Sequence, residues 1–280
     1  MEFTLALEFT FSSQRTCKNT LNLLKYKFLM GWLALNFTDL GNVYWDNKET
    51  LEDKLIVNYL NVSNINADDM YILYDAASDE RKQKSKIYKR KIDADICICS
   101  ESLLKYTIKE ITGKSLIKKD ISIAYEYNEF GKPYLKSNNL FFNISHSSEW
   151  IAVVCDLAEV GIDIERIRPA EPRMICRLFS DEEIGYINSG LCSERHRRFT
   201  KLWTIKESYV KYIGTGLLTS LKSFRVDVSN KRIIDLCDTD NYDVIKYSKE
   251  TVPNYYMSVC GKNEQALIKE IKLEDLFMDF

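Results

Sequence analysis

The chain has 280 residues, of which 45% are hydrophobic, and it carries a formal net charge of −2. A charge so close to zero excludes a general nucleic-acid-binding domain, which is usually strongly basic, while the hydrophobic content is enough to bury a sizeable core. The eight cysteines form no C-x-x-C pair and no zinc-like spacing. We therefore expect reduced thiols in the core of a cytoplasmic protein.

The N-terminus begins Met1-Glu2-Phe3-Thr4, with no basic segment ahead of an apolar stretch, so a signal peptide is not expected. The most apolar segment, Phe28–Phe37, is too short to span a bilayer, which needs about 20 apolar residues. No membrane association is therefore expected. We predict that residues 1–53 are a loosely attached extension; the alternative is an added element that packs on the rest of the chain.

Residues 54–157 are expected to form a first half that combines strands with two helical segments. Thr112 and Gly113 mark the end of the second helical segment. The predicted strands are 54–60, 121–127, 141–144 and 150–155, and the helical segments run from Ala67 through the basic residues 81–91 and over 94–112.

Residues 158–280 are expected to form a second half of similar content, with a boundary near 156–159. Ser180 is a plausible N-cap for one of its helices, and Gly214 ends another. The predicted helices are 172–179, 181–189 and 199–213. One strand is predicted to begin at Val160, and four more are predicted over 224–228, 232–236, 243–248 and 255–260.

The strand that begins at Val160 carries two acids on one face. Side chains alternate between the two faces of a strand, so Asp163 and Glu165 share a face. Ile162 and Ile164 share the other. Two carboxylates this close repel each other unless a cation lies between them or they face water. The pattern is therefore compatible with a pair of Mg²⁺ ligands or with an edge strand that has a solvated acidic face.

The helix predicted over 199–213 places Trp203, Glu207 and Lys211 on one face at steps of four residues. The simplest interpretation is an ordinary surface Glu–Lys pair, which contributes roughly 0.2–0.5 kcal/mol. A tryptophan on the same polar face fits that interpretation poorly. A third carboxylate that meets a metal, with a lysine beside it for a phosphate, fits better.

Four motifs in order resemble one known family. They are Gly131-Lys132-Pro133, the N-I-S-H-S run at 143–147, G-I-D-x-E at 161–165 and W-x-x-K-E-S-x-x-K at 203–211. Together they resemble the 4'-phosphopantetheinyl transferases, most closely the monomeric type that activates surfactin synthetase. The resemblance runs from about Lys54 to the C-terminus.

The resemblance implies an α+β fold with two similar α/β halves related by a pseudo-twofold axis and an active site in the cleft between them. It implies a monomeric enzyme that moves the 4'-phosphopantetheine arm of coenzyme A to a serine hydroxyl of an apo acyl or peptidyl carrier protein. The reaction would need Mg²⁺ and would release 3',5'-ADP. A non-catalytic relative that only binds coenzyme A or a carrier protein is the alternative, although such a relative should lack at least one of Asp163, Glu207 and Lys211.

The resemblance also implies individual roles. Asp163, Glu165 and Glu207 match the Mg²⁺ ligands, and Glu207 also matches the residue proposed as general base. Lys211 matches the lysine that contacts the phosphates and the leaving group. The remaining coenzyme A contacts would be Arg81, Lys84, Lys132, Ser145 and His146.

Two of these coenzyme A assignments have alternatives. A lone histidine is more often structural than functional. His146 stands between Ser145 and Ser147, where a histidine flanked by hydroxyls could bind a phosphate oxygen, and the match to the family motif favours that role. The basic residues 81–91 are typical of a solvated helix face or, less readily, of a nucleic-acid patch. In the register that aligns Arg81 and Lys84 with the family's phosphate-binding lysines, Ile96 and Cys97 replace an arginine and a small polar residue.

Overall fold

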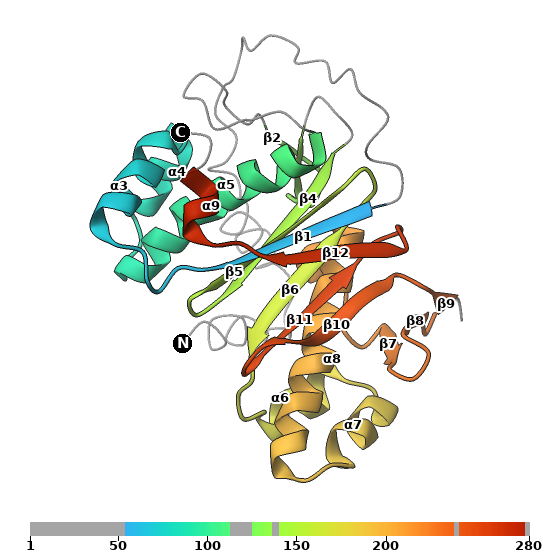
Figure 1. Ribbon diagram of the computed structural model, residues 1–280. Coiled ribbons are helices and arrows are strands. Elements are labelled where there is room, and N and C mark those ends of the chain that lie inside the picture. The colour runs from blue at the N-terminus through green and yellow to red at the C-terminus, as the bar shows by residue number, and fades with distance from the viewer. Residues whose placement is uncertain (1–53, 113–124, 136–139, 238–240, 278–280) are drawn as a thin grey trace, which may run out of the picture. The chain divides into compact units, whose positions relative to one another are not determined.

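The computed structural model describes residues 54–112, 125–135, 140–237 and 241–277 (Figure 1). The extension predicted at 1–53 and the first residues of the strand predicted at 121–127 lie outside the described residues. The described residues form a mixed α and β architecture, as predicted, with two main sheets and two long helices.

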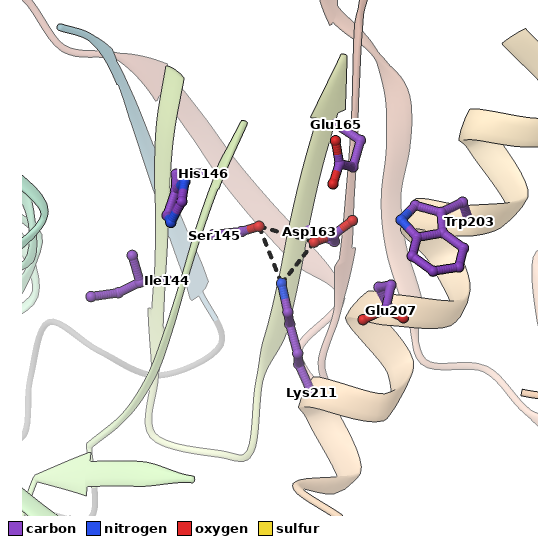
Figure 2. Close-up of a pocket in the computed structure, with 8 residues that line it drawn as sticks. All are labelled: Ile144, Ser145, His146, Asp163, Glu165, Trp203, Glu207 and Lys211. Carbon is purple, nitrogen blue, oxygen red and sulfur yellow. Dashed lines mark hydrogen bonds and ion pairs between the residues drawn. The ribbon is translucent and has the colours of Figure 1, made fainter. Parts of the chain in front are cut away.

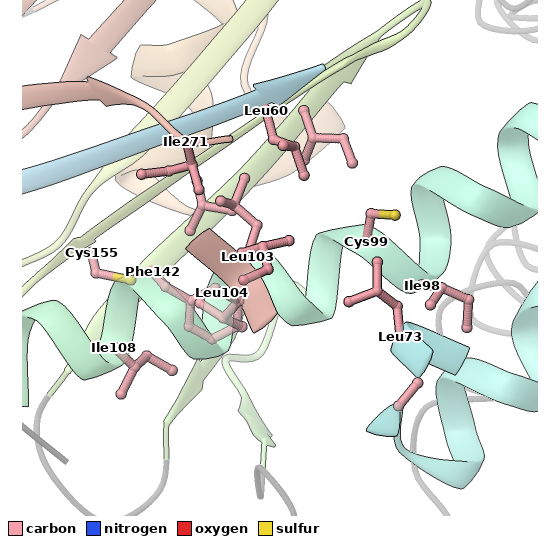
Figure 3. Packing of buried hydrophobic residues seen from close by; sticks show 14 of the residues in the cluster. Leu60, Leu73, Ile98, Cys99, Leu103, Leu104, Ile108, Phe142, Cys155 and Ile271 are labelled. Atoms are coloured by element: carbon pink, nitrogen blue, oxygen red, sulfur yellow. The ribbon is translucent and has the colours of Figure 1, made fainter. Parts of the chain in front are cut away.

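The first sheet has the strand order β12-β1-β5-β4. β12 runs parallel to β1, whereas the other neighbouring strands are antiparallel. Helix α5 (Lys91–Thr112) packs on one face of this sheet, where Leu103, Leu104 and Ile108 are fully buried (Figure 3). The strands are β1 (Lys54–Asn61), β4 (Phe141–Ser147), β5 (Trp150–Asp156) and β12 (Gln265–Glu270).

The second sheet has the strand order β10-β11-β6, and all its pairs are antiparallel. Helix α8 (Cys192–Ile213) packs on one face of this sheet, where the hydroxyls of Thr204 and Ser258 lie 2.8 Å apart. The strands are β6 (Gly161–Arg166), β10 (Ile245–Val252) and β11 (Tyr255–Cys260).

The two sheets pack against each other through a second apolar cluster. Leu55 and Val57 of the first sheet meet Ile162 and Ile164 of β6 there, and all four side chains are fully buried. The period-two alternation of the strands sends their other side chains to the helices. The result is a layered order of helix, sheet, sheet and helix, with β6 between the inter-sheet core and α8 (Figure 1).

The remaining elements are short. Among them, α7 begins with a capping box: Ser180 accepts a hydrogen bond from the Glu183 backbone, and the Glu183 side chain accepts one from the Ser180 backbone. The others are α3 (Ala67–Ala76), α4 (Asp79–Ser85), β2 (Tyr125–Tyr127), β3 (Pro133–Leu135), α6 (Pro172–Leu178), α7 (Asp181–Asn188), η1 (Gly216–Leu218), β7 (Phe224–Asp227), β8 (Arg232–Asp235), β9 (Asn241–Tyr242) and α9 (Leu273–Phe277).

Several predicted boundaries are wrong. The helical segment predicted from Ala67 through the basic residues is broken at Ala77, because Ser78 turns extended and caps a new helix, α4. Helix α8 begins at Cys192, seven residues before the predicted start, and ends before Gly214 as predicted. Strand β12 was not predicted; it comes from the second predicted half and pairs with β1 of the first.

Two further findings concern composition. The cysteines of the described residues are unpaired, but Cys176, Cys192 and Cys237 are exposed, so the core placement predicted for them is wrong. Within the described ranges, no helix is both long and apolar enough to cross a lipid bilayer.

Candidate active site

The site is built where α8 lies against β6, and a glycine allows the contact. A side chain at Gly161 would place its Cβ 2.0 Å from the Ser208 carbonyl oxygen and 2.3 Å from the Tyr212 backbone nitrogen, both in α8. No other residue fits without moving the helix away from the strand. The glycine of the G-I-D motif therefore sets how closely the acids of β6 approach the side chains of α8.

The end of α8 is fixed by a second glycine. Gly214 has a φ of +71°, in the left-handed region that glycine adopts without strain, and its N–H donates to the Val210 carbonyl. The helix therefore ends two residues after Lys211, which with Glu207 projects toward β6. Both lysine and glutamate reach the same pocket as Trp203 (Figure 2).

This pocket is lined by β4, β6 and α8 (Figure 2). It brings together the three predicted metal ligands, the predicted lysine, and two of the predicted coenzyme A contacts. Its lining residues are Ile144, Ser145, His146, Asp163, Glu165, Trp203, Glu207 and Lys211.

Lys211 is the centre of the hydrogen bonds in the pocket. Its Nζ donates to Asp163 Oδ1 at 2.7 Å, to Ser145 Oγ at 3.1 Å and to the Ile162 carbonyl at 3.1 Å. The Ser145 hydroxyl donates to the same Asp163 oxygen at 2.9 Å. The other oxygen, Asp163 Oδ2, is buried and has no hydrogen-bond partner among the residues that the structure describes. A buried acceptor without a partner is unusual in proteins, and a bound ion or water molecule would satisfy it.

Burial and mutual repulsion dominate the electrostatics of the pocket. Burial, followed by the charge of Asp163, raises the pKa values of Glu165 and of Glu207 to about 7 each. Burial also raises the pKa of Asp163, against the opposing effect of Lys211. Burial would lower the pKa of Lys211, but Asp163 and Glu207 outweigh it and hold that pKa above its ordinary value. Three carboxylates therefore share one ammonium group, and the pocket favours additional positive charge.

The donor set fits Mg²⁺, which prefers carboxylate oxygens and keeps sites open for water and phosphate. The unpartnered Asp163 Oδ2 gives such an ion a place to bind. Across the ranges that the structure describes, no three His, Cys, Asp or Glu side chains already stand in an arrangement that holds a metal. Asp163 Oδ1 is bound to Lys211 instead, so a cation would require the side chains of the pocket to adjust.

Three predicted coenzyme A contacts do not line this pocket. Arg81 lies in α4, where its Nε is 3.9 Å from Glu101 Oε2 and its carbonyl accepts from Cys97 Sγ at 3.9 Å. Lys84, in the same helix, has its pKa lowered by burial and by the neighbouring Arg81. The structure thus places the backbone of Arg81 beside Cys97 of α5.

Lys132 is committed to other partners. Its Nζ donates to the Glu159 carboxylate, to the Val160 carbonyl at 2.9 Å and to the Tyr212 carbonyl at 3.0 Å. These contacts tie the loop between β2 and β3 to the residue before β6 and to the last turn of α8. All three donors of the ammonium group are therefore in use.

Two polar residues near the pocket have contacts that the motifs do not reveal. Ser147 donates to Glu165 Oε2 at 2.9 Å, and Asn143 Oδ1 accepts from the Ile162 N–H at 3.0 Å. Both belong to the N-I-S-H-S motif, and their alternation with Ser145 was visible in the sequence. That alternation could have indicated one polar face of β4, but not which strand it meets.

Comparison with known proteins gives one family. The family model of the 4'-phosphopantetheinyl transferase superfamily matches residues 159–273, which include Asp163, Glu165, Glu207 and Lys211. The 4'-phosphopantetheinyl transferase Sfp of Bacillus subtilis (strain 168) is 32% identical over 66% of this chain and 81% of its own length.

Two other relatives extend the comparison. The 4'-phosphopantetheinyl transferase gsp of Aneurinibacillus migulanus is 28% identical over 69% of this chain and 81% of its own length. The L-aminoadipate-semialdehyde dehydrogenase-phosphopantetheinyl transferase of Saccharomyces cerevisiae is 29% identical over 49% of this chain and 54% of its own length.

Proposed function

Because the chain belongs to the 4'-phosphopantetheinyl transferases, we propose that it moves the phosphopantetheine arm of coenzyme A to a serine hydroxyl of an apo carrier protein. The reaction is Mg²⁺-dependent and releases 3',5'-ADP. The carrier is an acyl or peptidyl carrier of peptide, polyketide or fatty-acid synthesis. The enzyme acts as a cytoplasmic monomer.

One observation carries this proposal: the carboxylates of Asp163, Glu165 and Glu207 share a pocket with Lys211, and Asp163 Oδ2 has no partner there. These three residues would hold the Mg²⁺ ion. When bound, the ion neutralises negative charge on the diphosphate of coenzyme A. The match of all three residues and of Lys211 to the family motifs supports the same assignment.

In this proposal, Lys211 stabilises negative charge and Glu207 accepts a proton. Attack of the serine oxygen on the β-phosphorus of the diphosphate breaks the bond to the leaving phosphate, where negative charge accumulates. The Lys211 ammonium, fixed by Asp163 and Ser145, stabilises that charge. Glu207 takes the proton of the serine hydroxyl, and a pKa of about 7 suits a base that works near neutral pH. The metal and base roles compete for the same side chain.

Coenzyme A binding involves residues inside and outside the pocket. Ser145 and His146 line the pocket on the β4 side, and His146 is proposed to contact the 3'-phosphate. Arg81 and Lys84 are proposed to bind that phosphate from α4, on the register that aligns them with the family's two phosphate-binding lysines. For Lys132, a contact with coenzyme A stays a prediction, because its ammonium already has three acceptors.

The proposed organisation follows from the same comparison. We assign residues 54–157 to the coenzyme A half and residues 158–280 to the half with the metal ligands and α8, related by a pseudo-twofold axis. Each half supplies a sheet covered by a long helix, α5 or α8, which supports this division. Strand β12 is then an element of the second half that completes the sheet of the first. The extension at 1–53 is proposed to be dispensable for the activity.

The test is an assay of the purified protein with Mg²⁺, a fluorescent coenzyme A and a panel of apo carrier domains. We expect at least one carrier to be labelled, and labelling to stop when a chelator is added. The Glu207→Gln variant should still bind coenzyme A but lose at least about 10³-fold in turnover, because the carboxylate charge disappears with little change of shape. Wild-type labelling that persists at full rate in chelator, or in Glu207→Gln, would contradict the proposed roles. Coenzyme A binding without any labelling would favour the binding-only alternative.

A further inference from the structure

Strands β4 and β6 are joined by side chains rather than by backbone pairing. They belong to separate sheets in the described part of the chain, yet every second backbone N–H of β6 donates to a side chain of β4. The bonds are Ile162 N to Asn143 Oδ1 at 3.0 Å, Ile164 N to Ser145 Oγ at 3.3 Å and Arg166 N to Ser147 Oγ at 3.1 Å. We call Asn143, Ser145 and Ser147 the β4 ladder.

Two members of the β4 ladder also hold a carboxylate. A serine hydroxyl has one hydrogen to donate and two lone pairs to accept with. Ser145 donates to Asp163 Oδ1 and Ser147 donates to Glu165 Oε2, each at 2.9 Å. Each serine therefore donates to an acid of β6 and accepts from the N–H of the residue that follows that acid. This fixes both the position of the strand and the direction of the carboxylate.

The two acids differ in their other partners. Asp163 also receives the ammonium of Lys211 at 2.7 Å. Among the described residues, the ion pair of Glu165 is long, 3.9 Å to Arg168, whose side chain is 47% exposed. The buried Ser147 hydroxyl is therefore the short, well-shielded contact of Glu165.

We propose that Ser147 is a positioning residue that holds Glu165 toward the pocket in the orientation needed for a divalent cation. This inference rests on the proposed function, since it assumes that Glu165 is a metal ligand. Asn143 provides an internal control. It makes the same kind of bond to the β6 backbone, but within the described ranges it makes no hydrogen bond to a carboxylate.

Direct metal binding tests the proposal without relying on turnover. Mg²⁺ and Mn²⁺ are titrated calorimetrically into the full-length protein in the absence of coenzyme A. We expect Ser147→Ala to weaken the affinity about 10-fold or more, which is the usual range for partners of metal ligands. Asn143→Ala should change it less than about 2-fold. Ser147→Thr, which keeps the hydroxyl, should restore most of the affinity.

A double-mutant cycle separates positioning from general loosening of the strand. In a Glu165→Gln background, Ser147→Ala should have little further effect on metal affinity, because its action passes through the missing carboxylate. Equal effects in both backgrounds, or an equal loss in Asn143→Ala, would overturn the proposal. So would wild-type affinity in Ser147→Ala. If that single variant does not fold, the affinity of Ser147→Thr decides, and a loss as large as that of Glu165→Gln would overturn it.

The outcome for the proposed function is read separately. A wild-type protein that binds no divalent cation and labels no carrier would refute the proposed function itself. A wild-type protein that binds the cation and labels a carrier, with no change in Ser147→Ala, would refute only the role of Ser147.

Discussion

Helix α8 holds two ion-paired lysines five residues apart, and their surroundings are opposite. Lys206 is fully buried and makes three short contacts: with Glu183 at 2.9 Å and with the carbonyls of Leu221 and Phe224 at 2.6 and 2.8 Å. The hydrogen-bonding capacity of the Glu183 carboxylate is also satisfied, because it accepts the N–H groups of Ser180 and Val226 as well. The Lys206 ammonium therefore pairs with a single carboxylate, and both groups have all their hydrogen bonds satisfied.

Lys211, in contrast, lies among an excess of negative charge. Its side chain is 27% exposed and lies among three carboxylates, one of which keeps a buried oxygen without a partner. Both lysines belong to the same W-x-x-K-E-S-x-x-K motif. Within this motif, the lysine whose ion pair is complete is the structural residue, and the lysine among an excess of carboxylates is the one expected to meet a ligand.

Loss of the closed pair should have the largest effect on stability. We expect Lys206→Met to lower the free energy of unfolding by about 3–5 kcal/mol, because it leaves Glu183 as a buried, uncompensated charge. Urea denaturation followed by circular dichroism measures this. The double variant Lys206→Met/Glu183→Gln should recover much of the loss. An unchanged unfolding midpoint in the single variant would show that the ion pair between Lys206 and Glu183 does not form in solution.

The same substitution at the other lysine should affect the reaction instead. We expect Lys211→Met to lower turnover by about 10²–10³-fold, equivalent to about 2.7–4 kcal/mol, because it removes a fixed positive charge from the leaving phosphate. Its free energy of unfolding with Mg²⁺ present should fall less than that of Lys206→Met, since the Lys211 side chain is 27% exposed and the proposed Mg²⁺ ion would offset the lost charge. Single-turnover labelling of an apo carrier provides the rate. A variant that unfolds as readily as Lys206→Met would remove the distinction between the two lysines.

The sequence was sufficient for relations within one element. Period two put Asp163 and Glu165 on one face of a strand, and helical spacing put Glu207 one turn from Lys211; the structure has both arrangements. The helix end at Gly214 was also local, since a glycine can adopt the left-handed φ that ends a helix. The break at Ser78 was local as well and could have been predicted from its N-cap character.

Relations between distant elements were beyond the sequence. Helical spacing could have put Lys206 on the buried face, but its partner Glu183 comes from α7 and its acceptors come from the segment after α8. The return of β12 to β1 joins residues more than 200 positions apart. Likewise, the polar face of β4 gains its meaning only once β6 is known to lie beside it. Such pairings depend on the packing of the whole chain rather than on local pattern.

The pH dependence of stability gives a smaller and more specific test of the unbalanced cluster. Burial and the charge of Asp163 raise the pKa values of Glu165 and Glu207 to about 7, above their ordinary value of 4.5. A carboxyl with a raised pKa binds its proton more tightly in the folded state, so its stabilising contribution is present below about pH 4.5 and is lost as the pH rises through about 7.

We therefore expect the free energy of unfolding of the metal-free protein to fall by on the order of 2 kcal/mol between pH 5 and pH 8. Urea denaturation in the presence of a chelator measures the slope. Glu207→Gln is the matched control and should make the slope shallower, leaving the contribution of Glu165, and saturating Mg²⁺ should make the slope shallower in the wild type. A wild-type slope equal to that of the variant would mean that Glu207 is not buried among like charges.

Lys132 and Arg81 provide the smallest and sharpest comparison, because coenzyme A can be replaced by 3'-dephospho-coenzyme A. We expect Arg81→Ala to raise KM for coenzyme A by roughly 10-fold, through loss of a charged hydrogen bond, and to leave KM for the dephospho donor unchanged. Lys132 resembles Lys206 in having every donor satisfied. Lys132→Met should therefore lower transfer by the same factor with both donors and also lower the unfolding temperature. A loss confined to coenzyme A would instead make Lys132 a phosphate contact, and the closed ammonium would then have to open when the substrate binds.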